Sequence, residues 1–150
     1  MSLSMDEKIA VLRNAELFGA MTEEELNAVA QLAREVTYHT GETFIRQHER
    51  GDCLFLIVDG EAQVMLEGAG EIGRRGANSV IGELAILWKQ PRGANCVAAT
   101  PLTLLRVDYV DFWALMEAHP RLVRSAIDVL MRRLTEHADN LKKYGVDVME

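Results

Sequence analysis

The chain has 150 residues, of which 49% are apolar and 26% are charged, and this size fits one compact domain rather than a long multidomain enzyme. Sixteen basic and 23 acidic residues give a net charge of −7, which excludes an overall positive field for nucleic acid or an anionic membrane surface. Two cysteines, Cys53 and Cys96, are too few for a disulfide scaffold or a cysteine-based metal site. No apolar stretch approaches the roughly 20 residues that span a bilayer. The sequence therefore predicts a soluble, cytoplasmic protein without a metal site, in which any anion is held locally.

Two amphipathic helices are predicted in the N-terminal segment, residues 5–34. Apolar residues at helical spacing predict the first helix over residues 5–18, and Gly19 stands where it would stop. Thr22 and Glu25 match a capping box, in which the hydroxyl and the carboxylate satisfy each other's free backbone amides. The second helix is therefore expected to start after Thr22 and to run to about residue 34.

Residues 35–107 change to a β pattern. Branched and aromatic residues occur there in short runs, separated by glycines at a spacing close to ten residues. The first four predicted strands are 36–39, 42–48, 53–59 and 61–67. This spacing predicts a mainly β fold, a small barrel or jelly roll.

The second part of the β region contains a glycine-rich segment and two more strands. Four glycines and two arginines lie between residues 68 and 76, and we predict an exposed hairpin tip there. Further strands are predicted at 95–100 and 102–107, on either side of Pro101, which lacks an amide donor and favours a break. The β region then ends near residue 107.

Residues 108–145 are predicted to be helical. One helix over 109–118 ends at His119-Pro120, and a longer helix runs from about residue 121 to 143, with Gly145 as its stop. Apolar residues recur along the longer helix at spacings of four, three, four and seven, and we call them the apolar seam: Val123, Ile127, Leu130, Leu134 and Leu141. The seam predicts either a homodimer contact or packing against the β-barrel of the same chain.

The segment 81–98, IGELAILWKQPRGANCVA, has the features of a phosphate site. Gly82 permits a sharp turn into a short helix, whose first amides have no partners within the helix and attract an anion. Arg92, held behind a proline, adds a forked and permanently charged donor. The two small residues that follow, Gly93 and Ala94, let the backbone come close to a ligand.

Glu83 has a different expected role because its carboxylate would repel a phosphate. It is suited to accept a hydrogen bond from a neutral hydroxyl on the same ligand. The alternative is a purely structural role, in which Glu83 is a favourable charge at a helix N-terminus. A sugar phosphate would satisfy both Arg92 and Glu83.

This segment closely resembles the phosphate-binding cassette of cyclic-nucleotide-binding domains, a family that includes the regulatory subunits of cyclic-AMP-dependent protein kinase and bacterial catabolite activators. The joint occurrence of Gly-Glu-Leu-Ala and Pro-Arg with an upstream glycine series is a specific signal. LFGAMTEEELNAVA at 17–30 and GETFIRQHERGDCLFLIVDGEAQVM at 41–65 resemble the family's entry helix and first strands, so the resemblance covers roughly residues 15–142. It implies a jelly-roll β-barrel (double-stranded β-helix) flanked by N-terminal helices and a long C-terminal helix.

The resemblance also implies roles for the residues of the cassette. Glu83 would accept the ribose 2′-hydroxyl, Arg92 would pair with the exocyclic oxygens of the cyclic phosphate, and the amides of Ala85 and Gly93 would complete the site. The ligand-binding residues implied are Gly82, Glu83, Leu84, Ala85, Arg92, Gly93 and Ala94. Gly93 stands where the family commonly has alanine, serine or threonine, and the missing hydroxyl favours cyclic AMP over cyclic GMP. Asn78 stands where the family usually has glycine, and asparagine tolerates a left-handed backbone.

The predicted function is a non-enzymatic sensor that binds a cyclic nucleotide, favouring cyclic AMP, with cyclic GMP as the other candidate and no further cofactor. Movement of the C-terminal helix over the base would carry the signal to a downstream protein or a fused output domain. Arg132, Arg133 and Thr135 are the candidate base contacts, because they lie midway along that helix. The alternative is a ligand-free module of the same fold that serves dimerisation or docking.

Two other classes of function are not supported. A jelly-roll enzyme of the cupin type needs two or three histidines grouped with a carboxylate around a metal, but the four histidines are scattered: His39, His48, His119 and His137. A DNA-reading member of the resembled family carries a helix-turn-helix after the long helix, whereas this chain stops at Glu150. Direct DNA binding is therefore not expected.

Overall fold

The computed structural model describes residues 2–82 and 91–142, except for the side chains of residues 137, 138 and 140–142. Its first two helices are α1 (Met5–Arg13) and α2 (Glu23–Leu32). Thr22 Oγ1 accepts a hydrogen bond from the Glu25 amide, and the Glu25 carboxylate accepts one from the Thr22 amide. The capping box predicted for the second helix is therefore confirmed. The bond from the Thr22 amide holds the pKa of Glu25 below its usual value.

The first helix is shorter than the sequence pattern predicts. α1 ends at Arg13 instead of Phe18, because Asn14 caps the helix and Leu17 adopts a left-handed φ of 77°. Turns follow the helix, and both Leu17 and Phe18 are buried within them. Consecutive residues of a helix point about 100° apart, so leaving the helix allows both neighbours to enter the core.

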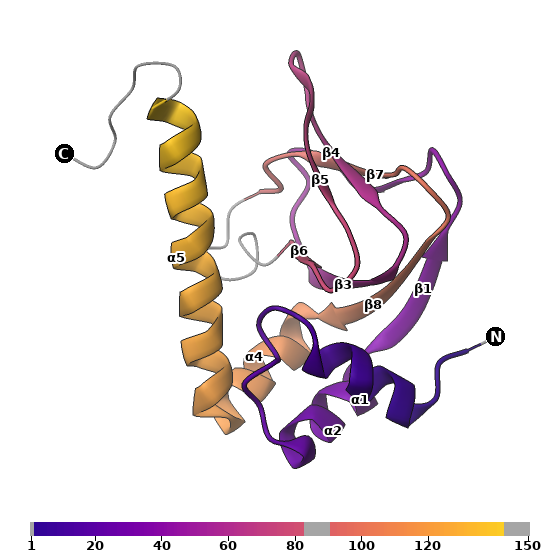
Figure 1. The fold of residues 1–150 in the computed structure, drawn as a ribbon, viewed down its shortest axis with the longest axis vertical. Coiled ribbons are helices and arrows are strands. Elements are labelled where there is room, and N and C mark those ends of the chain that lie inside the picture. The colour runs from indigo at the N-terminus through magenta and orange to yellow at the C-terminus, as the bar shows by residue number, and fades with distance from the viewer. Residues whose placement is uncertain (1, 83–90, 143–150) are drawn as a thin grey trace.

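The β strands of the described residues form two antiparallel four-stranded sheets (Figure 1). One sheet has the order β1-β8-β3-β6, and the other has the order β2-β7-β4-β5. The strands are β1 (Arg34–Tyr38), β2 (Thr43–Ile45), β3 (Cys53–Asp59), β4 (Ala62–Leu66), β5 (Gly70–Arg75), β6 (Val80–Ile81), β7 (Asn95–Ala98) and β8 (Leu102–Asp108). The predicted jelly-roll type of fold is confirmed, as a sandwich of two sheets and not a closed barrel.

Strand β3 is buried on both faces, which explains its unbroken apolar run. Phe55 and Ile57 lie in the core between the two sheets. Leu54 and Leu56 point to the other face and join a second core, formed with the helices. The sheet that contains β3 therefore separates a sheet core from a helix core.

The glycine-rich segment 68–76 is a strand over most of its length, so the prediction of an exposed hairpin tip there is wrong in extent. β5 pairs with β4, and the turn is confined to residues 67–69. The β4–β5 hairpin projects from the sandwich in Figure 1. The sequence pattern misses β5 because this edge strand is held by backbone pairing while its side chains meet solvent, and Ile72 is 56% exposed.

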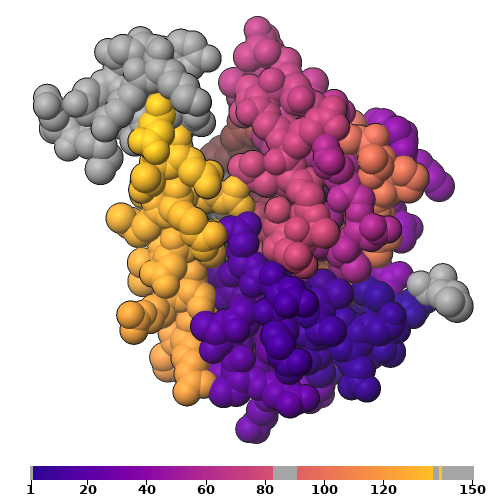
Figure 2. Space-filling view, in the orientation of Figure 1, coloured from indigo at the N-terminus to yellow at the C-terminus, as the bar shows by residue number. Residues whose placement is uncertain are grey.

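Two helices follow the sandwich, α4 (Tyr109–Ala118) and α5 (Pro120–Lys142), and both were predicted. Leu122, Ala126 and Val129 bury one side of α5 in the helix core. Beyond these contacts α5 runs along the side of the molecule (Figures 1 and 2). In the described ranges, no helix has both the length and the apolar character needed to cross a membrane.

Replacing Thr22 by alanine is expected to lower the free energy of unfolding by about 1 kcal/mol, because the amide of Glu25 loses its side-chain acceptor. Urea unfolding followed by circular dichroism measures this change. Thr22→Ser keeps a hydroxyl and should unfold close to the parent. Equal losses in both variants would show that the methyl group and not the cap is responsible.

Candidate functional site

The structure brings two of the predicted site residues, Gly82 and Arg92, into contact. Gly82 directly follows β6, and Arg92 lies shortly before β7. Arg92 Nη1 donates to the carbonyl oxygen of Gly82 at 3.1 Å, and Arg92 Nη2 donates to the carbonyl oxygen of Cys53 at 2.6 Å. Only 7% of Arg92 is exposed. We call Arg92 and these two carbonyl groups the Arg92 site.

Gly82 is glycine for two separate reasons. Its φ is +91°, a conformation that residues with a Cβ rarely adopt. In addition, a Cβ at this position would overlap Nη1 of Arg92 and lie 3.3 Å from the carbonyl oxygen of Cys53. The close approach between the Gly82 backbone and the Arg92 guanidinium therefore depends on the absence of a side chain.

The turn between β2 and β3 forms hydrogen bonds with both the carbonyl and the amide of Arg92. The His48 amide donates to the Arg92 carbonyl at 2.8 Å, and the Arg92 amide donates to the Glu49 carbonyl at 2.8 Å. Arg50 and Pro91 form an antiparallel bridge beside these bonds. Hydrogen bonds therefore hold both the backbone and the guanidinium of Arg92 in one position.

Arg92 carries a buried positive charge beside neutral groups. Its guanidinium contacts two carbonyl oxygens, and Nη2 lies 3.9 Å from Cys53 Sγ. Burial raises the pKa of the Cys53 thiol to about 11, so this sulfur is uncharged near neutral pH. In the part of the chain that the structure describes, no carboxylate is ion-paired with Arg92. Because a guanidinium has five N–H donors and a buried charge is costly without a counter-charge, the Arg92 site is suited to an anion.

The remaining cassette residues are only partly described. Glu83, Leu84 and Ala85 lie outside the described residues. Gly93 is exposed in the bend that follows Arg92, with open space where a Cβ would stand, and Ala94 is half-buried. Upstream of the cassette, Asn78 has a φ of 75°, which confirms the left-handed backbone predicted for it.

The three candidate base contacts on α5 have other partners in this structure. Arg132 and Arg133 both donate to the carboxylate of Glu16, at 3.1 and 3.3 Å. Arg133 also donates to the carbonyl oxygen of Val80, and Thr135 Oγ1 donates to the carbonyl oxygen of Met131. A role for these residues in base binding stays a prediction.

Sequence reasoning missed several groups that the structure places around these residues. The carbonyls of Cys53 and Glu49 and the amide of His48 act through the main chain, which no side-chain motif reveals. Glu16 lies 116 residues before Arg132, and its position after an amphipathic helix carries no signal of this pairing. These contacts arise only when the folded chain brings distant loops together.

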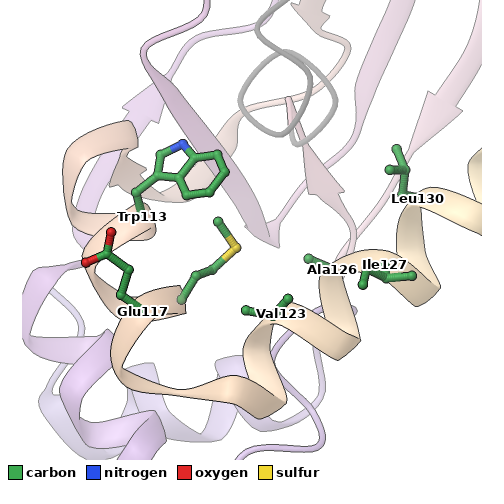
Figure 3. Close-up of a pocket in the computed structure, with 7 residues that line it drawn as sticks. Trp113, Glu117, Val123, Ala126, Ile127 and Leu130 are labelled. Carbon is green, nitrogen blue, oxygen red and sulfur yellow. The ribbon is translucent and has the colours of Figure 1, made fainter.

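The apolar seam does not pack against the sandwich of its own chain, so that alternative is wrong for its described members. Val123 is 40% exposed, Ile127 53% and Leu134 42%, whereas Leu130 is half-buried. The side chain of Leu141 lies outside the described residues. Part of the seam lines a groove of about 360 Å³ between α4 and α5 (Figure 3), whose lining is Trp113, Met116, Glu117, Val123, Ala126, Ile127 and Leu130.

The fold and the Arg92 site together define a class of protein, a two-sheet jelly-roll domain with flanking helices and a buried arginine suited to an anion. Residues 35–119, more than half of the chain, match the family described as the cyclic nucleotide-binding domain. The chain belongs to this family. The resemblance inferred from the 81–98 segment is therefore confirmed at the level of the family.

The curated relatives include a kinase regulatory subunit and a protein kinase. The cAMP-dependent protein kinase regulatory subunit of Yarrowia lipolytica is 30% identical over 118 residues, which cover 79% of this chain and 31% of that protein. The cGMP-dependent protein kinase egl-4 of Caenorhabditis briggsae is 32% identical over 136 residues, which cover 87% of this chain and 18% of that protein. The chain thus spans less than a third of the length of these relatives.

Solved structures agree on the fold. The catabolite activator protein of Thermus thermophilus superposes with a TM-score of 0.79 at 24% identity, over 87% of this chain and 63% of that chain. The regulatory domain of Toxoplasma gondii PKA, solved with cAMP, superposes with a TM-score of 0.73 at 25% identity, over 87% of this chain and 50% of that chain. Both likenesses support a jelly-roll sandwich with flanking helices.

Proposed function

We propose that this protein is a sensor that binds a cyclic nucleotide, favouring cyclic AMP, at the Arg92 site, and that binding itself is its activity. Arg92 pairs with the exocyclic oxygens of the cyclic phosphate, and Gly93 and Ala94 allow the backbone to approach it. Glu83, which lies outside the described residues, accepts the ribose 2′-hydroxyl in this proposal. The signal passes through α5 to a downstream protein or to an output domain fused to this chain.

The observation that carries the proposal is the buried charge of Arg92. Within the described ranges its partners are uncharged, and two of its five N–H donors already hold it against the Gly82 and Cys53 carbonyls. The donors that remain are suited to a phosphate, which would supply the missing negative charge. The alternative of a ligand-free docking module gives no reason for a buried, preorganised arginine at this place.

The preference for cyclic AMP rests on Gly93. A hydroxyl at this position would be able to bond to a guanine or a phosphate, and glycine has none. The relatives include both the regulatory subunit of a cAMP-dependent kinase and a cGMP-dependent kinase, so similarity alone does not choose the base.

Calorimetric titration of the purified protein, freed of carried-over nucleotide, tests the proposed function. Cyclic AMP is expected to bind with micromolar or tighter affinity and cyclic GMP more weakly, while 5′-AMP, which is not cyclic, serves as the control. Tighter binding of cyclic GMP would reverse the base preference. The absence of heat with either cyclic nucleotide, in protein shown to be folded, would favour the docking module.

A specific observation favours self-association as a second role. Ile127, Met131 and Leu134 form an exposed apolar stripe on α5, with exposures of 53%, 57% and 42%. Helical spacing places these residues on one face, and such a face in water is commonly covered by a partner. We propose that a second copy of this chain covers it.

The double variant Ile127→Glu with Leu134→Glu is therefore expected to convert a dimer to a monomer, since each copy would bring charges into the contact. Sedimentation equilibrium measures the mass. Val110→Glu is the matched control, because Val110 is 73% exposed but lies on α4 and not on the stripe. A monomeric parent, or a dimer that survives the double variant, would contradict this contact.

A further inference from the structure

A polar contact links α5 to the strand that ends at the Arg92 site. Glu16, in the turn after α1, accepts a hydrogen bond from Arg133 Nη2 at 3.3 Å. The same Nη2 donates to the carbonyl oxygen of Val80 at 3.2 Å. We call the Glu16 carboxylate, the Arg133 guanidinium and the Val80 carbonyl the Glu16–Arg133 clasp. It joins three segments that are far apart in the sequence.

Arg133, and not its neighbour Arg132, is the main residue of this contact. The Arg133 side chain is 13% exposed, whereas that of Arg132 is 57% exposed and bonds, among the described residues, to Glu16. Exposed ion pairs contribute little because water and salt screen them. A shielded guanidinium that bonds both a carboxylate and a main-chain carbonyl has a larger effect.

The clasp lies where the apolar packing of α5 has ended. Leu122, Ala126 and Val129 bury the first half of the helix in the core. After Val129, the side chains that the structure describes are exposed, except for Leu130 and Arg133, which are half-buried. Leu130 lines the groove beside α4, so among the described side chains of this half of α5, Arg133 is the one that bonds to a strand of the sandwich.

Strand β6 connects the clasp to the site over a very short distance in the chain. Val80 begins the strand, Ile81 ends it, and the Gly82 carbonyl then accepts the bond from Arg92. The amide of Glu16 also donates to the carbonyl of Asn78 at 3.3 Å. The segment 78–82 is thus held by Glu16 and Arg133 at one end and by Arg92 at the other.

We infer that Arg133 is a positioning residue for the nucleotide site: held by Glu16, it fixes the Val80 carbonyl and hence the Gly82–Arg92 geometry. This inference rests on the proposed function. When the clasp is broken, the segment 78–82 must be ordered at the moment of binding, which lowers affinity. By linkage, bound nucleotide then favours the formed clasp and the position that α5 has in this structure.

The test is a calorimetric titration of cyclic AMP into the parent and the variants Arg133→Gln, Glu16→Gln and Arg124→Gln. Loss of the clasp is expected to weaken binding about tenfold in Arg133→Gln and about threefold or more in Glu16→Gln. Arg124→Gln is the matched control, since Arg124 is an exposed arginine of the same helix that belongs neither to the clasp nor to the predicted site, and it should bind within about twofold of the parent. Urea unfolding of each variant shows that binding is measured on folded protein. Glu16→Gln breaks the clasp without changing any residue of α5, so a loss of affinity in this variant does not come from a damaged helix.

The double variant Glu16→Gln with Arg133→Gln separates positioning from a direct contact with the base. If Arg133 acts through the clasp, the double variant loses no more affinity than Arg133→Gln alone. Additive losses would show that Arg133 contacts the ligand itself and would overturn the inference. Parent-like binding by Arg133→Gln and Glu16→Gln would overturn it as well, while the proposed function would stand. A parent that binds no cyclic nucleotide would overturn the proposed function, and this inference with it.

Discussion

Arg92→Ala is expected to weaken the binding of cyclic AMP by about 30-fold to 700-fold, which corresponds to about 2–4 kcal/mol. The reason is that the cyclic phosphate would enter a site whose buried positive charge is gone, while the Gly82 and Cys53 carbonyls stay in place. Calorimetric titration measures the change in affinity. Arg92→Lys keeps the charge but loses the planar fork, so an intermediate loss is expected.

Arg74→Ala is the control for this prediction. Arg74 is an arginine of the β4–β5 hairpin that pairs with Glu61 and Glu71, and its side chain is 49% exposed. Its removal changes the net charge by the same amount as Arg92→Ala and should leave affinity within about twofold of the parent. Arg92→Ala that is folded and binds like the parent would show that the phosphate site lies elsewhere.

Gly82→Ala is expected to destabilise the fold by about 1–3 kcal/mol and to weaken cyclic AMP binding together with it. The alanine must adopt a φ of +91°, and its Cβ would overlap Nη1 of Arg92. The guanidinium therefore has to leave the position in which its bond to the Cys53 carbonyl holds it. Urea unfolding measures the first effect, and nucleotide titration measures the second.

Gly68→Ala separates the two causes, because Gly68 also has a positive φ, +81°, but has no heavy atom within 4 Å of the position of a Cβ. This variant should show only the backbone cost, about 1 kcal/mol, with unchanged affinity. The difference between the two variants reports the contact with Arg92. Equal affinities for both variants would mean that the position of Arg92 does not control binding.

Local features of the structure were predictable from the sequence where a short stretch of residues contains all of the information. The Thr22 capping box and the helices α2, α4 and α5 are of this kind, because hydrogen bonds and apolar spacing within one segment determine them. The left-handed backbone of Asn78 is another case. Among the predicted helices, the C-terminal end of α1 was misjudged, since its position depends on Leu17 and Phe18 entering a core made by distant elements.

The candidate site was only half predictable. Gly82 and Arg92 were identified by residue type and spacing, and the fold brings them into contact. The Cys53 and Glu49 carbonyls and the His48 amide, which hold Arg92, belong to another turn and act through the main chain. Their effect is independent of side-chain identity, so no motif can reveal it.

The sequence by itself determined the family of this protein, its jelly-roll type of fold and the arginine suited to a phosphate, because each is carried by a local pattern of glycines, apolar residues and a Pro-Arg pair. That the strands form two open sheets and not a closed barrel was decided by the tertiary structure. The tertiary structure decided which face of α5 is buried and which partners Arg92 and Arg133 have. Leu122 and Val129 are buried while Val123 and Ile127 of the same helix are exposed, although all four are equally apolar in kind. Helical periodicity defines the faces of α5, but only packing against the sandwich and α4 selects the face that is buried away from water.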